Sequence, residues 1–154
     1  MRYLETGMVE LSDLDVPPEE HMLRGVAVTE CVQPIPCDPC RHSCPVGAVI
    51  MEDINDVPRI DYGKCTGCAR CVEVCPGLAM FVVKLDSEWG YVTLPYEFLP
   101  LPEKGEVVEA LDREGRTVEE GTVVSVRKGG TTPVVRVRVS RENVMVVRNI
   151  RVRR

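Results

Sequence analysis

The alternation of apolar and polar residues is most regular in the C-terminal third of the chain. After Gly105, apolar positions alternate with polar or charged ones in EVVEAL, TVVSVR and PVVRVRV, and the turn sequences DREG and EEG lie between the first two. This spacing predicts short strands with one buried face and one wet face. We therefore expect residues 105–154 to form a small β-barrel of the SH3-like kind, with an OB-type barrel as the alternative.

The rest of the chain is patterned less strongly. GVAVTE (25–30) and PRIDY (58–62) predict two short strands, each just ahead of a group of cysteines. Residues 85–104 contain three prolines and four of the seven aromatic residues, which predicts a connector whose aromatic side chains pack the two parts together or contact a partner. Residues 1–27 are an acidic extension with a Pro17–Pro18 break.

A 31-residue duplication lies between these regions. Three cysteines recur at this distance: Cys37, Cys40 and Cys44 in the first copy, and Cys68, Cys71 and Cys75 in the second. Each copy ends in a similar way, with CPVGAVI and CPGLAMF. Two copies of this size predict a pseudo-two-fold unit in which each half covers the other. The fold class is therefore α+β, with this unit at 28–84 ahead of the barrel.

The cysteine spacing indicates iron–sulfur chemistry. Cys65-x2-Cys68-x2-Cys71-x3-Cys75-Pro is the bacterial iron–sulfur run, in which three close thiolates bind one cluster and the fourth points toward a second cluster. Disulfides would require an oxidising compartment. Zinc usually takes two separated pairs of ligands, and a thioredoxin-like dithiol requires a βαβ unit. Two copies of the run favour iron–sulfur clusters over these three alternatives.

Targeting signals, charge distribution and composition indicate where the protein is located and what its surface can contact. The N-terminus shows no signal peptide and no apolar run is long enough to span a membrane, so we expect a cytoplasmic protein with reduced cysteines. Residues 1–102 carry 7 Lys+Arg and 16 Asp+Glu, whereas residues 103–154 carry 12 and 8. This asymmetry indicates either two contact surfaces or simply two solvated faces. The low content of Asn and Gln hints at a thermophile.

Residues 28–84 resemble the bacterial-type ferredoxins that hold two [4Fe–4S] clusters. The resemblance implies that the fourth ligands are exchanged between the copies. One cluster would be held by Cys65, Cys68, Cys71 and Cys44, and the other by Cys37, Cys40, Cys75 and one further cysteine.

Cys31 is the candidate for that further ligand, although its spacing departs from the family. The position in the first copy that corresponds to Cys65 is occupied by Pro34, and Cys31 stands before Cys37 in a C-x5-C spacing. Pro34 and Pro36 stiffen this loop and can bend it back toward the cluster. If Cys31 is instead a bystander, that cluster has three thiolates. His42 is a weaker candidate for a ligand, and a surface position explains it equally well.

A narrower resemblance covers residues 28 to roughly 140. TECVQPIPCDPCRHSCPVGAV, KCTGCARCVEVCPGLAMFVV and LPYEFLPLPEKGEVVEALDREG are similar to the small iron–sulfur subunits associated with FAD-dependent amino-acid dehydrogenases of the proline or hydroxyproline type. The resemblance implies a hetero-oligomer with the flavin subunit and a small [2Fe–2S] protein. This link rests on the association of such subunits with dehydrogenases and not on particular residues of this chain.

These observations predict an electron-transfer subunit that relays single electrons from a flavin-dependent dehydrogenase subunit to an acceptor, with the C-terminal barrel as a docking domain. We identify no base, nucleophile or phosphate loop, so no catalytic site of its own is expected. A free-standing soluble dicluster ferredoxin is the alternative. A nucleic-acid-binding barrel with structural clusters is a remote one, because the net charge of −5 is acidic and no nucleic acid is expected.

Overall fold

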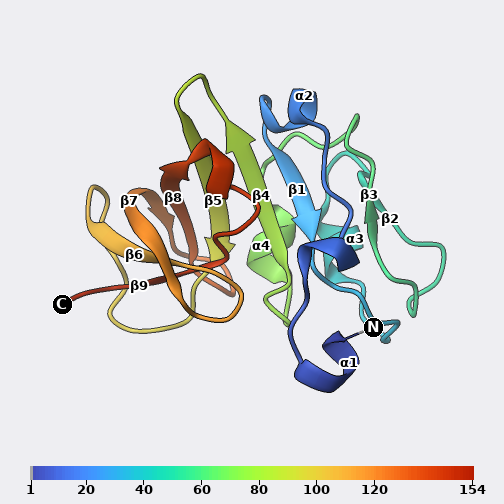
Figure 1. Ribbon diagram of the computed structural model, residues 1–154. Helices are drawn as coiled ribbons and strands as arrows, with labels where there is room; N and C mark the ends of the chain where they lie inside the picture. Colours follow the sequence, from blue (N-terminus) through green and yellow to red (C-terminus); the bar gives the residue numbers. More distant parts are fainter. Residues whose placement is uncertain (1) are drawn as a thin grey trace.

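A computed structural model describes residues 2–154 (Figure 1). The N-terminal extension contains three single-turn elements, α1 (Tyr3–Thr6), η1 (Leu11–Asp13) and α2 (Glu19–Met22). This blue segment runs along the cysteine-rich half, beside strand β1 (Val26–Thr29). None of the helices in the described part of the chain has the length and apolar character needed to cross a bilayer.

The duplication seen in the sequence is also present in the backbone. Helices α3 (Pro39–Ser43) and α4 (Arg70–Val74) occupy equivalent positions in the two repeats and pack against each other. Strand β1 pairs with β4 (Met80–Leu85), and β2 (Val49–Ile50) pairs with β3 (Arg59–Ile60), both antiparallel. The first strand of each repeat therefore pairs with the last strand of the other repeat.

The two pairings also share one register. Thr29 lies opposite Met80, and Val49 lies opposite Ile60. Within the duplication, Val49 is equivalent to Met80 and Thr29 is equivalent to Ile60. The two strand pairs therefore have equivalent registers in the two copies of the duplication.

The C-terminal strands continue the sheet that β1 and β4 begin. They are β5 (Trp89–Pro95), β6 (Val107–Leu111), β7 (Thr117–Arg127), β8 (Val134–Ser140) and β9 (Asn149–Arg151), with η2 (Arg141–Asn143) after β8. The seven-stranded sheet has the order β1-β4-β5-β8-β7-β6-β9, and all neighbours are antiparallel. In Figure 1 this sheet runs from the cysteine-rich half into the orange and red C-terminal strands.

The predicted closed barrel is not found in the described residues. Closure would require an outer C-terminal strand to pair back onto β5, but β5 already has β4 on one side and β8 on the other. The register shifts between Val123 and Ser125 in the pairing of β7 with β8, and between Ala110 and Leu111 in the pairing of β6 with β7, so β7 has one additional residue in each pairing. The α+β class is confirmed, and the C-terminal strands are correctly predicted as β structure.

Residues 85–104, predicted as a connector, include a central strand. Within this range β5 pairs along its whole length with β8. Its aromatic residues lie under arginines of β8, with the guanidinium carbon of Arg138 4.4 Å from the centre of the Trp89 ring and that of Arg136 4.9 Å from the centre of the Tyr91 ring. These cation–π contacts occupy two arginines of the basic C-terminal part.

One hydrophobic core extends through both halves of the molecule. It is rich in valine and joins side chains of β1 and β4 to side chains of the C-terminal strands; its fully buried members include Val26, Val28, Val83, Val92, Leu94, Val108, Val135, Val137 and Val147. A second cluster includes Cys40, Cys71, Val72 and Met80 beside the cysteine loops. Because the first core is shared, the C-terminal strands are part of the support for the cysteine-rich half.

The shared core predicts a large cost for truncating a side chain in β5. Leu94→Ala should lower the free energy of unfolding by about 2–5 kcal/mol, because Leu94 is fully buried and its removal leaves a cavity. Leu99→Ala is the matched control, since Leu99 is 88% exposed. Anaerobic denaturant titration, followed by far-ultraviolet circular dichroism, measures both. Equal stability of the two variants would contradict a core that passes through β5.

Candidate functional site

One cavity lies at the interface of the two repeats. Its walls are apolar residues that include Ala27, Val49 and Val82. Four thiols line it: Cys44 from the first repeat and Cys65, Cys68 and Cys71 from the second. The structure therefore brings together the four cysteines of the first ligand set implied by the ferredoxin resemblance.

A wider groove lies along the other cysteine group. Cys31, Cys37 and Cys75 line it, together with Tyr3 and Val9 of the N-terminal extension. Cys75 comes from the second repeat, whereas Cys31 and Cys37 come from the first. This groove gathers three of the four cysteines in the second implied set, and its outer wall is formed by the extension.

Backbone amides are aimed at the exchanged thiols in the same way in both repeats. The amide of Ala48 donates to Cys44 Sγ at 3.2 Å, and the amide of Ala79 donates to Cys75 Sγ at 3.4 Å. The two bonds have the same sequence separation, because in each repeat the chain turns at the Cys-Pro sequence before it enters a strand. A third amide, that of Ala27 in β1, donates to Cys65 Sγ at 3.3 Å. Such N–H···S contacts favour the thiolate and tune the potential of a cluster.

The pKa values of the buried thiols of Cys71 and Cys40 are raised by burial and by the charges of neighbouring cysteines. Burial, followed by the charges of Cys65 and Cys68, raises the pKa of Cys71 to about 12. Burial, together with the charges of Cys75, Cys31 and Cys37, raises the pKa of Cys40 to about 11.

Cys31 belongs electrostatically to this second group. Burial raises the pKa of the Cys31 thiol, and the charges of Cys75 and Cys37 raise it further. Cys31 is half-buried, so it is not a freely solvated side chain at the surface. It therefore lies close to the other three cysteines of the second implied set.

The thiol of Cys44 behaves in the opposite way. Burial acts to raise its pKa, but backbone hydrogen bonds from Ala48, Val46, Val49 and Gly47 outweigh burial and lower it. These amides form the turn after Cys44, and their partial positive charges stabilise a thiolate.

The donor set fits iron–sulfur clusters. In the described part of the chain, no three His, Cys, Asp or Glu side chains converge on the position of a single metal ion. A four-iron cluster requires a wider arrangement than a single ion, because each thiolate binds a different iron atom. The eight thiols, in two groups with apolar walls and amides aimed at sulfur, satisfy that requirement for two clusters.

The two histidines and Tyr62 lie outside the thiol groups. His42 is exposed, and its Nε2 lies 2.9 Å from Oδ2 of Asp38, the residue before α3. His21 Nδ1 lies 2.7 Å from the guanidinium of Arg24, and its ring is 6.0 Å from that of Tyr62. The Tyr62 hydroxyl donates to the carbonyl of Asp15, which ties the N-terminal extension to the second repeat.

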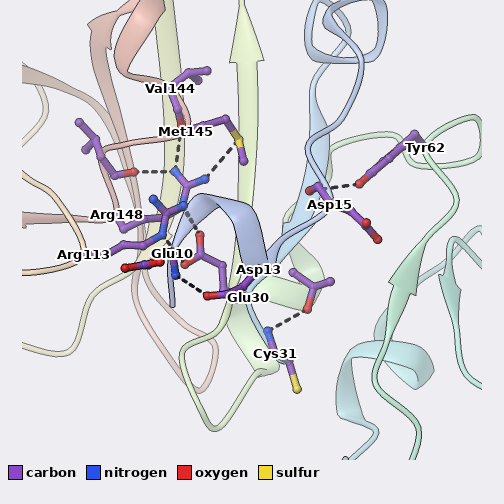
Figure 2. Close-up of polar contacts among 12 residues, drawn as sticks. Glu10, Asp13, Asp15, Glu30, Cys31, Tyr62, Arg113, Val144, Met145 and Arg148 are labelled. Carbon is purple, nitrogen blue, oxygen red and sulfur yellow. Dashed lines mark hydrogen bonds and ion pairs between the residues drawn. The ribbon is translucent and has the colours of Figure 1, made fainter. Parts of the chain in front are cut away.

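Sequence reasoning missed four charged residues that contact the cysteine loops. Glu30, directly before Cys31, accepts from Arg113 and Arg148 (Figure 2). Arg127 donates to the carbonyls of Cys68 and Ala69, both at 3.3 Å. The three arginines lie in the C-terminal strands and loops. The sequence contained one clue to this ion pair. Arg148 follows the apolar run VMVV, and a charged side chain that is buried with such a run requires a partner.

Comparison with known proteins supports the same chemistry. Residues 58–81 match the family of 4Fe-4S binding domains. A probable iron–sulfur subunit of the Frd operon of Proteus vulgaris is 34% identical over 76 residues, which cover 48% of this chain and 47% of that protein.

Two further relatives match over shorter stretches. Pyruvate synthase subunit PorD of Methanocaldococcus jannaschii is 42% identical over 55 residues, covering 36% of this chain and 59% of that protein. A selenate reductase subunit of Mesobacillus selenatarsenatis is 39% identical over 54 residues, covering 32% of this chain and 18% of that protein. The chain thus spans less than two thirds of the length of each of these relatives. No solved structure matches it significantly. Residues 58–81 are thus similar to a 4Fe-4S binding domain, and the comparisons support [4Fe–4S] clusters as the cofactors of this chain.

The opposite pKa shifts predict different thiol reactivities in cluster-free protein. Because the thiolate is the nucleophile, alkylation of Cys44 should show its pH inflection below the ordinary thiol range, whereas Cys40 should inflect near pH 11. Mass spectrometry after timed iodoacetamide labelling gives each rate, and the inflection is independent of how accessible each sulfur is. A common inflection for both cysteines would contradict the amide turn as a source of thiolate stabilisation.

Proposed function

We propose that this chain is an electron-transfer subunit with two [4Fe–4S] clusters, one bound by Cys44, Cys65, Cys68 and Cys71 and the other by Cys31, Cys37, Cys40 and Cys75. The observation that carries the proposal is the cavity between the repeats, which is lined by Cys44 of one repeat together with three thiols of the other. The charges of Cys37 and Cys75 raise the pKa of both Cys31 and Cys40, and Cys31 also raises that of Cys40, which supports the second set.

The clusters would accept and donate one electron each. The residues of this chain would bind them, exclude water from the apolar cavity, and direct amides of Ala27, Ala48 and Ala79 at the sulfurs. The packing of α3 against α4 keeps the two thiol groups close to each other. The pKa of Cys71, in the second repeat, is also affected by Cys40 of the other group, which supports a short path between the clusters.

The relatives support a place in a larger oxidoreductase. All three described above are named as subunits, and the first is named as an iron–sulfur subunit. We propose a hetero-oligomer in the cytoplasm in which an FAD-dependent amino-acid dehydrogenase subunit supplies the electrons, with a small [2Fe–2S] protein as a further partner. This finer assignment rests on the resemblance of residues 28 to roughly 140 to the small subunits of such complexes. Segment 105–154 is the proposed docking part.

A free-standing dicluster ferredoxin is the second candidate, and one observation favours it. Strands β5 to β9 share the core with β1 and β4, so the C-terminal part has a structural task that does not require a partner. Anaerobic purification from the native source separates the two candidates. Co-elution with a flavoprotein, followed by reduction of the clusters when amino acids are added, supports the role in a complex. Elution as a single 17.2 kDa chain supports the free ferredoxin.

Cluster content gives the first test of the ligand sets. Iron and acid-labile sulfide should each be about eight per chain after anaerobic isolation, because two cubanes hold four of each. A value near four of each would contradict the second cluster, and stoichiometric zinc would contradict both.

The exchange of the fourth ligands gives a sharper test. Cys75→Ala should damage the cluster of Cys37 and Cys40, whereas Cys44→Ala should damage the cluster of Cys65, Cys68 and Cys71. Electron paramagnetic resonance of the reduced protein, with iron analysis, distinguishes the two losses. The variants are matched, because Cys44 and Cys75 occupy equivalent positions and accept equivalent amide bonds. Damage confined to the cluster of the same motif in each variant would rule out the crossed assignment.

A further inference from the structure

The two repeats fix the start of their cysteine loops in different ways. In the second repeat, Asp61 does so locally: its Oδ1 accepts from the amides of Gly63 at 3.0 Å and Lys64 at 3.3 Å, and its carbonyl accepts from the amide of Cys65 at 3.1 Å. Glu30 occupies the equivalent position in the first repeat. Because Cys31 follows Glu30 directly, the first repeat has no room for this local turn before its first thiol.

Glu30 is instead held by two arginines that are distant in sequence. Arg113, in the turn between β6 and β7, donates through Nε at 2.9 Å and Nη2 at 2.8 Å to the two carboxylate oxygens. Arg148, just before β9, donates through Nε to Oε2. The three side chains are largely buried, with 9% of Glu30, 16% of Arg113 and 4% of Arg148 exposed. Figure 2 shows the carboxylate beside the two guanidinium groups, with Cys31 on the adjoining stretch of chain.

Arg148 is itself fixed on several sides. Its Nη1 donates to the carbonyls of Val144 at 2.9 Å and Val147 at 2.6 Å, and its Nη2 lies 3.3 Å from Met145 Sδ. The guanidinium also lies over the Phe81 ring of β4, 5.0 Å from its centre. These contacts leave the Arg148 side chain little freedom, so it provides a rigid anchor for the Glu30 carboxylate.

The held Glu30 side chain restrains the backbone directly before Cys31. The amide of Glu30 donates to the carbonyl of Ala79 at 2.8 Å, and the amide of Cys31 donates to Thr29 Oγ1 at 3.2 Å. Beyond Cys31 the loop is exposed from Gln33 to Pro36, although the backbone amide of Gln33 hydrogen-bonds to the Cys31 thiol. The buried side chain and backbone of Glu30 therefore fix the stretch of chain that leads into Cys31.

Stability alone does not account for this network. A buried cluster of charges loses solvation, and an apolar replacement of similar volume is often equally stable. Such a network instead fixes a geometry, because bidentate arginine–carboxylate bonds are directional. The geometry fixed here is that of the residue before Cys31.

We propose that Glu30, anchored by Arg113 and Arg148, is a positioning residue that holds Cys31 in place as the fourth thiolate of the cluster bound by Cys37, Cys40 and Cys75. This inference rests on the proposed ligand sets and extends them. The C-terminal strands then have a role at a cluster, because they supply both arginines.

The test compares Arg113→Met and Glu30→Gln with Arg116→Met as the matched control. Arg116 lies in the same turn between β6 and β7, but it is 71% exposed and pairs with Asp112 and Glu114 rather than with Glu30. A cubane iron without its thiolate leaves as Fe²⁺, and oxidation of the remaining [3Fe–4S] core by one electron with ferricyanide gives a species that is visible by electron paramagnetic resonance. That signal, and the rate of iron release to a chelator, are the readouts.

Arg113→Met and Glu30→Gln should release iron from this cluster about tenfold faster than the parent, since losing a charge-assisted hydrogen bond corresponds to about a power of ten. They should also give the [3Fe–4S] signal, while the cluster of Cys44, Cys65, Cys68 and Cys71 keeps its spectrum. Arg116→Met should match the parent. Arg113→Lys should fall between the parent and Arg113→Met, because an ammonium keeps the charge but loses the bidentate geometry.

Cys31→Ala separates failure of this inference from failure of the ligand assignment. If Cys31→Ala gives the [3Fe–4S] signal but Arg113→Met and Glu30→Gln match the parent, the positioning role is overturned and the ligand assignment stands. Equal loss of both clusters in Arg113→Met and Glu30→Gln would show that the network stabilises the whole fold and does not act on Cys31 in particular. That result would also overturn the inference. If Cys31→Ala matches the parent, the ligand assignment fails, and the positioning role fails with it.

Discussion

Hydrogen bonding on both edges of β4 is the constraint on which the rest of the structure depends. β4 ends the second repeat, and it pairs with β1 of the first repeat on one edge and with β5 on the other. The first pairing produces the crossed arrangement that puts Cys44 beside three thiols of the other repeat. The second joins the cysteine-rich half to the C-terminal strands through a common core. An unpaired edge of β4 would leave a row of exposed amides and carbonyls beside the thiol groups.

The two thiol groups are related by symmetry but differ in what surrounds them. The cavity of Cys44, Cys65, Cys68 and Cys71 is narrow and apolar, and the guanidinium of Arg127 donates to carbonyls of its loop. The groove of Cys31, Cys37 and Cys75 is wider, bordered by the N-terminal extension and adjoined by the buried charges around Glu30. Cluster potentials depend on local charge, hydrogen bonds and solvent exposure. Two clusters in these surroundings would therefore differ in potential.

The C-terminal part contacts both cysteine loops through residues that lie far apart in sequence. Arg127, at the end of β7, donates to the carbonyl of Ala69 at the start of α4, and Thr131, in the loop after β7, donates to the carbonyl of Glu73 within that helix. Arg113 and Arg148 hold Glu30 beside the other thiol group. These contacts connect the sheet to each cysteine loop separately. A change in the C-terminal strands can thus reach one cluster without altering any ligand.

The sequence by itself determined the chemistry and its duplication. Cysteine spacing depends only on short-range geometry, so the thiol runs, the 31-residue repeat and the strands at 26–29 and 59–60 could be predicted from local pattern. The tertiary structure decided how those parts join. Alternating residues in β6, β7 and β8 specify a buried face but not a partner strand, because backbone hydrogen bonds at a strand edge are the same for every neighbour. The sheet therefore continued from β4 through β5 rather than closing on itself. The partners of Glu30 lay beyond prediction for a related reason, since ion pairs between residues separated by 83 and 118 positions leave no periodic trace in the sequence.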